Sequence, residues 1–391
     1  MATAVAALAA TALLLGGVLR ESSSAAPAAL AGAQSAEDFK QGFSLNGSTA
    51  SLVADLQSRL QADPKDSIAV SGLGSLALSR HRFRTALTLG ERAHALNPYS
   101  AQPLGVIGDA QVELGRYRDA FASFDRMNKL RPSLSSYARV SYGRELIGHT
   151  SGAIRAMKLA VDAATGGAEP TAWTHVQLGK LYFNHGRYEE AEREYRVALQ
   201  VFPGYAYGLD ALAQVLGATG RHRQAIAAER QAVDAIPLPQ YVAALGDLYR
   251  VTGRQALATR QYDLIGAIER LLNANGVKTD LEIALFQVDH GIALRHALDR
   301  ARLARAERPS IDGEDVLAWA LARNGRCADA LPHSQAALRL GTQDALKFFH
   351  RGMIERCLGH ATAARHWFER ALALNPQFSL LWTPVAERYA R

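Results

Sequence analysis

The chain of 391 residues has few cysteines, only Cys327 and Cys357, and lacks the short motifs of common enzyme classes. It contains no G-x4-G-K-[ST] phosphate loop, no G-x-S-x-G nucleophile turn and no H-E-x-x-H zinc motif. Catalysis therefore has no support in the sequence. We predict that the protein is not an enzyme and uses no cofactor.

Long runs of like charge are also missing, although the 44 basic residues outnumber the 37 acidic ones. No run reaches five residues, so the charges are expected to form a mixed, solvated surface. Nucleic-acid binding needs a clustered basic stripe, and none is present. We therefore predict no nucleic-acid partner.

The first 33 residues differ from the rest of the chain. Residues 2–19 are apolar without interruption, and small-x-small triplets follow at 29–31 and 31–33. This resembles a secretory signal peptide, although no Lys or Arg precedes the apolar segment. About 18 apolar residues can also span a bilayer, so residues 1–33 are predicted as a signal peptide or an N-terminal membrane anchor. We expect export to the periplasm, the exterior or the outer side of the cytoplasmic membrane, with cleavage or retention left open.

A spacing of 34 residues recurs along the chain, as from Pro64 to Pro98 and from Pro98 to Pro132. An alanine lies 12 residues before five of the prolines that follow this count: Ala86, Ala120, Ala191, Ala225 and Ala364. A 34-residue period is typical of an array of helical hairpins. Such an array has no upper size limit, because each unit packs only on its neighbours.

The most complete unit is residues 172–203. It contains Leu178-Gly179-x2-Tyr182, then Ala191-x3-Tyr195, and finally Pro203. This pattern resembles the tetratricopeptide repeat family, and the resemblance covers residues 67–376. It implies an all-α fold, a right-handed superhelical solenoid of helical hairpins.

Counting in this phase predicts nine units, which start near residues 67, 101, 134, 172, 206, 239, 278, 311 and 345. Residues 34–51 are expected to be a small-residue and polar linker, and 52–66 a degenerate leading helix. A longer second helix is expected in the sixth unit, roughly Gln255 to Asn273. Residues 377–391 are predicted to contain a helix, over 378–390, that covers the last apolar face.

The second half also carries a narrower resemblance, in Thr279-Asp-Leu-Glu-Ile-Ala-Leu-Phe-Gln-Val-Asp-His-Gly291 and Leu317-Ala-Trp-Ala-Leu321. These segments look like exported bacterial tetratricopeptide proteins of unassigned role. The resemblance implies a bacterial source and export, and it implies no activity.

In this family the first helices line the concave groove, and fixed offsets from each unit's start select the side chains that face inward. Large apolar side chains outside the packing positions mark interaction surfaces. Two interpretations are open for Trp173: its side chain lines the groove, or it packs against the loop at 165–170. The predicted partner-binding groove comprises Asp109, Glu113, Tyr142, Glu145, Trp173, Lys180, Phe183, Tyr207, Asp210, Gln214, Asp247, Arg250, Phe286, Trp319, Arg323 and Phe349. The same offsets also select Glu282, Asp289, His290, Asp312, Asp315 and Met353.

The leading function is a non-catalytic scaffold that binds a protein or peptide in this groove, outside the cytoplasmic membrane. Residues 2–19 could tether it to the membrane. One alternative is an assembly factor for an envelope or metal-transport system, and another is an accessory domain of an enzyme complex. The assembly factor would hold a weak metal site at Glu282, Asp289, His290 and His350, although their spacing is not diagnostic. The favoured alternative is that Asp289 and His290 cap a helix that ends at Gly291 and form local hydrogen bonds.

The two cysteines lie two residues past Gly325 and two residues before Gly359, in adjacent units. Both therefore fall at the edge of the solenoid that carries the turns. A disulfide between Cys327 and Cys357 is possible if their side chains face each other, and the alternative is two free thiols.

Overall fold

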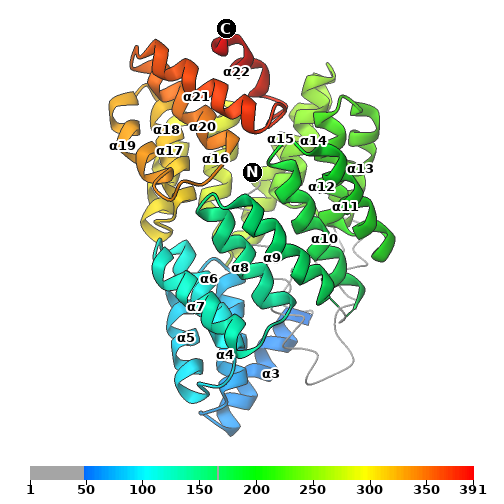
Figure 1. Ribbon diagram of the computed structural model, residues 1–391, viewed down its shortest axis with the longest axis vertical. Coiled ribbons are helices and arrows are strands. Elements are labelled where there is room, and N and C mark those ends of the chain that lie inside the picture. Colours follow the sequence, from blue (N-terminus) through cyan, green and yellow to red (C-terminus); the bar gives the residue numbers. More distant parts are fainter. Residues whose placement is uncertain (1–47, 165–166) are drawn as a thin grey trace.

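The computed structural model describes residues 48–164 and 167–391, in which every regular element is a helix (Figure 1). The predicted export segment, residues 1–33, and the linker as far as residue 47 lie outside these ranges. The leading helix α3 spans Ser48–Ala62, so it begins inside the segment predicted as linker. The all-α solenoid expected from the sequence is confirmed.

Helices α4 to α21 form nine consecutive antiparallel pairs, and α22 (Thr383–Ala390) closes the array. Each pair is one repeat unit, numbered 1 to 9 here. The pairs are α4 (Ser67–Ser79) and α5 (Phe83–Leu96); α6 (Gln102–Glu113) and α7 (Tyr117–Leu130); α8 (Leu134–Leu146) and α9 (Thr150–Asp162); α10 (Ala168–Phe183) and α11 (Tyr188–Val201); α12 (Ala206–Ala218) and α13 (His222–Ala235); α14 (Pro239–Val251) and α15 (Gln255–Ala274); α16 (Asp280–His290) and α17 (Leu294–Glu307); α18 (Ile311–Arg323) and α19 (Cys327–Ala337); α20 (Ala345–Cys357) and α21 (Ala361–Leu374).

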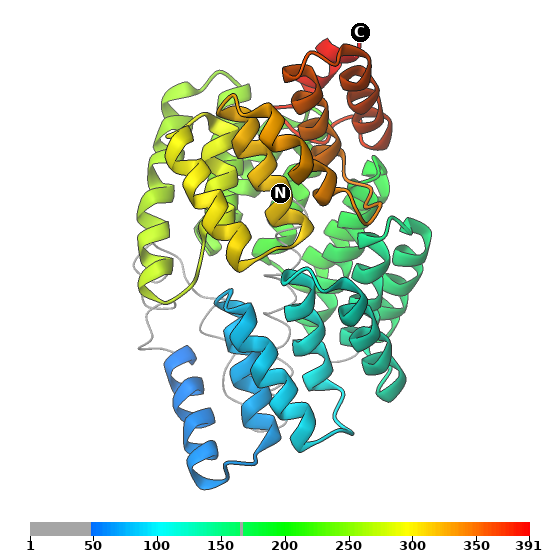
Figure 2. The ribbon, with the colours of Figure 1, turned by 90° about the vertical axis from the view of Figure 1, so that its left-hand side faces the viewer.

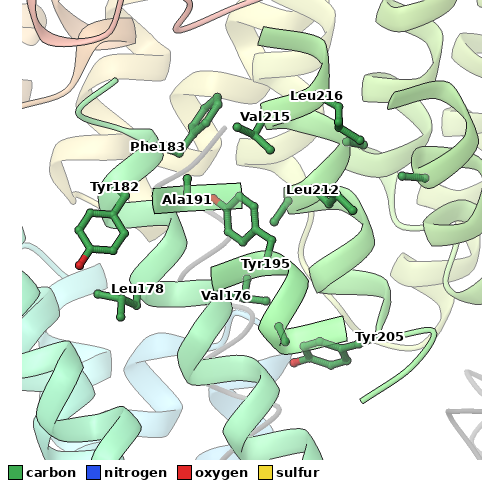
Figure 3. Close-up of a cluster of buried hydrophobic side chains, with 14 of the residues drawn as sticks. Val176, Leu178, Tyr182, Phe183, Ala191, Tyr195, Tyr205, Leu212, Val215 and Leu216 are labelled. Carbon is green, nitrogen blue, oxygen red and sulfur yellow. The ribbon is translucent and has the colours of Figure 1, made fainter. Parts of the chain in front are cut away.

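Close packing within unit 4 depends on a glycine in its first helix, as it does in units 2, 6 and 9. A Cβ atom at Gly179 would lie 2.3 Å from the ring of Tyr195, so only glycine lets the ring lie flat against α10. Tyr195 is 1% exposed and lies among Ala191, Val176 and Leu212 in the core that Figure 3 shows. The repeat's small residues are therefore packing requirements.

The solenoid coils back on itself. The interhelix turn of unit 1 meets the start of unit 7, and the next three turns meet units 8, 9 and the closing segment in the same way. In Figures 1 and 2 the yellow and orange units lie against the blue and cyan ones. We call this line of contacts the seam; its hydrogen bonds join His81 Nδ1 to Lys278 O (2.6 Å), Ile311 N to Tyr117 Oη (2.6 Å), Thr342 Oγ1 to Leu146 O, and Asn375 Nδ2 to Phe183 O (2.9 Å).

An ion pair reinforces the seam. Arg308, which precedes unit 8, donates to the carboxylate of Glu113 at the end of α6, 195 residues away, at 3.0 Å through its second terminal nitrogen. It also donates to Glu282 of α16 at 3.0 Å. Burial alone would lower the pKa of Arg308, but the two carboxylates outweigh it and raise that pKa. The guanidinium therefore stays charged and holds three units together.

The closing helix is shorter than the sequence predicts. It begins at Thr383, not near residue 378, because the segment before it is held in turns on the seam. Asn375 accepts from Tyr188 Oη at 2.5 Å, and Ser379 Oγ accepts from the N–H of Trp382 at 3.2 Å. These local bonds compete with helical ones, so the helix starts only after they end.

Within residues 48–164 and 167–391, no helix combines the length and the apolar character needed to cross a membrane.

Candidate binding cavity inside the superhelix

The seam encloses a cavity of about 140 Å³ on the inner side of the superhelix. Its lining comes from first helices and inter-unit loops of units 3 to 9 and from the closing segment, so no single repeat forms it. The lining residues are Glu145, Phe183, Asn184, Gln214, Pro239, Gln240, Ala243, Leu281, Glu282, Leu285, Phe286, Asp312, Asp315, Val316, Thr342, Gln343, Asp344, Ala345, Leu346, Lys347, Asn375 and Phe378.

Several acids of the cavity lie in or beside the first turn of a helix. Asp344 is the N-cap of α20 and accepts hydrogen bonds from the N–H groups of Leu346 (2.9 Å) and Lys347 (3.1 Å). Asp312 lies in the first turn of α18. A carboxylate at this position satisfies free N–H groups and the positive end of the helix dipole. Local helix chemistry therefore explains why acids gather at this edge of the cavity.

Lys347 connects two of these acids. Its ammonium lies 2.8 Å from Asp312 and 2.7 Å from Asp344, and its side chain is 3% exposed. Burial raises the pKa of Asp344, but Lys347 lowers it more, to about 2. The three groups form a charged cluster that is neutralised only in part, because one lysine faces two carboxylates.

Glu145, on α8 of unit 3, also lines this cavity. Its carboxylate accepts a long bond, 3.4 Å, from the amide of Asn184. Burial raises the pKa of Glu145 to about 7, with Asn184 opposing this shift and Asp344 adding to it. Near neutral pH the cavity thus contains a carboxyl group that is only partly ionised.

The structure places four of the predicted groove residues on this cavity: Glu145, Phe183, Gln214 and Phe286. Most of the other predicted groove residues also lie on first helices, but their side chains already contact other residues of the protein. Asp109 forms an ion pair with Arg139 at 2.7 Å, and Glu113 is held by Arg308 across the seam. Asp109 and Arg139 pair because they lie on the first helices of adjacent units, whereas Glu113 and Arg308 pair because the superhelix brings distant units together.

The predicted aromatic residues are mostly core residues. Trp173, Trp319 and Phe349 are 5%, 1% and 0% exposed and belong to apolar clusters. Trp173 therefore packs rather than lining the cavity. Tyr142 and Tyr207 are half-buried against neighbouring clusters.

The remaining predicted groove residues lie apart from the cavity. Lys180 and Asp210 are buried, and Asp210 accepts from Gln214 at 2.9 Å. The guanidinium of Arg323 lies over the rings of Trp319 and Trp382. The other two are Asp247, which pairs with His290, and Arg250, which is exposed.

The four metal candidates do not come together. His290 donates from Nδ1 to Phe286 O and from Nε2 to Asp247, each at 2.7 Å, so neither nitrogen has a lone pair for a metal. Asp289 accepts from the indole N–H of Trp319 at 2.8 Å. Glu282 pairs with Arg308 and His350 with Asp315. In the described part of the chain no three His, Cys, Asp or Glu residues are grouped for a metal ion.

The groove prediction missed several lining residues. Lys347 and Asp344 lie at the start of unit 9, outside the offsets used for inward-facing positions. Asn184 and Asn375 lie in turns. The N-cap pattern of Asp344 before an apolar helix start was a usable signal for that residue, but its proximity to Glu145 depends on the seam.

Cys327 and Cys357 form a disulfide, with Cα atoms 6.1 Å apart. Cys327 begins α19 and is 4% exposed, whereas Cys357 ends α20 at the surface. Their side chains face each other across adjacent units, one of the two arrangements that the sequence left open.

Known proteins resemble parts of this chain. The tetratricopeptide repeat family matches residues 172–205. Superkiller complex protein 3 of Mus musculus is 39% identical over 85 residues, which is 22% of this chain and 5% of that protein. Protein O-mannosyl-transferase TMTC1 of Homo sapiens is 28% identical over 222 residues, 54% of this chain and 24% of that protein. The chain thus spans about a quarter or less of either relative's length.

Among solved structures, the human IFIT1 dimer with PPP-AAAA aligns with 79% of this chain and 72% of its own, at 14% identity and a TM-score of 0.49. The family match falls on unit 4, whose alanine position recurs in all nine helix pairs and whose glycine–aromatic contact recurs in units 2, 6 and 9. The chain therefore contains a tetratricopeptide repeat, and its helix pairs form a solenoid of the tetratricopeptide type.

Proposed function

We propose that the protein is a non-catalytic scaffold that binds a segment of a partner protein inside the superhelix. The observation that carries this proposal is the cavity, which combines an apolar wall with polar groups from units 3 to 9. Binding sites of this composition fix a ligand by apolar contact and orient it by a few polar groups. Peptide binding on the inner surface would therefore engage units 3 to 9 together, because each of them contributes to the cavity lining.

The experiment compares inner and outer surfaces. Tagged full-length protein is used to capture partners from its native host, with Phe183→Ala and Gln214→Ala as cavity variants. Arg193→Ala, on the exposed face of α11, is the matched outer control. Circular dichroism checks that each variant is folded.

Loss of the retained partner in both cavity variants, with retention in the Arg193→Ala variant, supports the proposal. Retention in the cavity variants and loss in the outer variant would contradict it.

We further propose that the protein acts outside the cytoplasmic membrane of a bacterium. The apolar segment 2–19 and the Cys327–Cys357 disulfide support this location, because disulfides persist in oxidising compartments. A bacterial source stays a prediction, since the relatives named above are mammalian. Fractionation of the host and sequencing of the mature N-terminus test the location and distinguish cleavage from a membrane tether.

A role as an accessory domain of an enzyme is the second candidate, because one relative is named as a transferase. Co-purification with an enzyme subunit would favour it over a free scaffold.

A further inference from the structure

The cavity has an apolar side. Three rings and a branched chain come from α10, α16 and the closing segment, contributed by Phe183, Leu285, Phe286 and Phe378. Its volume, about 140 Å³, is close to that of an engineered cavity of roughly 150 Å³ that accepts benzene. One side chain of a partner therefore fits, whereas a folded element does not.

The other side of the cavity is acidic. Five carboxylates line it, against one cation, Lys347; the acids are Glu145, Glu282, Asp312, Asp315 and Asp344. Four of them have a close cationic or imidazole partner, and one of these, Glu282, pairs with Arg308 at 3.0 Å. Asp312 and Asp344 share Lys347, and Asp315 accepts from the Nδ1 of His350 at 2.9 Å.

Two carboxylates retain acceptor capacity. Glu282 uses Oε1 for Arg308, while its buried Oε2 has no hydrogen-bond partner among the described residues. Glu145 accepts the 3.4 Å bond from the Asn184 amide; among the described residues it forms no salt bridge, although the charges of Lys347 and Lys180 act on it. A buried carboxylate oxygen without a donor is costly, so a positively charged donor would be favoured at this site.

We propose that the cavity takes one lysine or arginine side chain of the bound partner segment, an inference that rests on the proposed function. The apolar side packs the methylene stem of that side chain, and Glu145 and Glu282 accept hydrogen bonds from its charged end. The excess of carboxylates over cations selects against an acidic residue at the same position.

The test measures peptide binding to the full-length protein by calorimetry at pH 8. The probes are acetylated and amidated Ala-Leu-X-Leu-Ala peptides in which X is lysine, arginine, norleucine or glutamate. We expect the lysine and arginine peptides to bind at least about 10-fold more tightly than the norleucine peptide, a difference of roughly 1.4 kcal/mol. The glutamate peptide should bind more weakly still.

Variants assign the effect to the cavity. Glu145→Gln should remove most of the preference for lysine over norleucine. Glu282→Gln should act in the same direction, with its folding checked because Glu282 also holds Arg308. Glu189→Gln, on the exposed face of α11, is the matched control and should change nothing.

Equal affinities for the lysine and norleucine peptides, or no binding of any peptide, would overturn the inference. An n-butylammonium ion that binds as tightly as the lysine peptide would assign the cavity to a free amine and also overturn it. The proposed function is judged separately, since capture that depends on Phe183 and Gln214 can succeed while the charge preference fails.

Discussion

The phenolic oxygen of Tyr117 accepts a hydrogen bond of 2.6 Å from the backbone N–H of Ile311, which lies 194 residues further along the chain. Tyr117 begins α7 of unit 2, and Ile311 begins α18 of unit 8. The bond ties the turn of one unit to the start of the unit six positions later. One superhelical turn therefore takes six units, and its two ends are joined by specific contacts.

Tyr117→Phe should destabilise the protein by about 1 to 3 kcal/mol, because it leaves the buried N–H of Ile311 without an acceptor. Tyr99→Phe is the matched control, since Tyr99 is 89% exposed, and it should have no measurable effect. Urea unfolding measures both. Equal free energies of unfolding for the two variants would mean that the bond contributes nothing.

Glu145→Gln should change the pH dependence of stability. The carboxyl pKa is about 7 in the folded protein against 4.5 for the free group. The folded state thus keeps a proton that the unfolded state releases between these values. Its contribution to stability is fully present below pH 4.5 and is lost as pH rises through 7.

The Glu145→Gln variant has no carboxyl group to ionise, so its stability does not fall in this way as pH rises. It should be more stable than the wild type at pH 8 by about 1 to 3 kcal/mol. At pH 4 the two should be equal, because both states of the wild type are then largely protonated. A stability difference that is the same at both pH values would refute the assignment.

Ala191→Leu tests the phase of the repeat. Ala191 is 0% exposed between the helices of unit 4, so the larger side chain should cost about 1 to 3 kcal/mol through overpacking. Glu190→Ala removes only a surface pair with Arg187 and should change stability by less than about 0.5 kcal/mol. Similar losses in urea melts would show that the phase is assigned wrongly.

Reduction of the disulfide should lower the free energy of unfolding by about 3 kcal/mol, because the bond closes a loop between residues 30 apart in sequence. The measurement compares unfolding with and without reductant, using Cys327→Ala/Cys357→Ala protein as the control that reductant should not affect. Thiol counting on unreduced, denatured protein should find no free thiol, and two free thiols would contradict the pairing.

The positions of the repeat units could be predicted because small and aromatic residues recur at the helix-packing positions. Gly179, Ala191 and Tyr195 each meet one packing requirement, and the same glycine–aromatic contact recurs in other units, as between Gly108 and Phe124. Helix pairs and turns follow from such requirements. The start of α22 was not predicted correctly, since the turns at Asn375 and Ser379 depend on contacts with unit 4 and with their own neighbours.

The site was harder to predict because it depends on superhelical pitch. The offsets correctly placed Glu145, Phe183 and Phe286 on inner helices. They could not show that Glu113 would meet Arg308 or that Lys347 would meet Asp312, because a small rotation per unit, summed over six units, decides which walls touch. Several residues that were predicted to bind a partner therefore form ion pairs or hydrogen bonds with other residues of the protein.

The closed superhelix is tested most directly by a double-mutant cycle on Glu113 and Arg308. Their side chains are 5% and 4% exposed, and they are in contact only if units 2 and 8 meet. Each single change, Glu113→Gln and Arg308→Met, should cost about 3 to 5 kcal/mol, because the first leaves the buried Arg308 with Glu282 alone and the second leaves the buried Glu113 without its cation. The double variant should lose less than the sum of the two, with a coupling energy of about 1.5 to 3 kcal/mol from urea unfolding. Additive losses, with a coupling energy under about 0.3 kcal/mol, would mean that the two residues do not touch and that the superhelix is open.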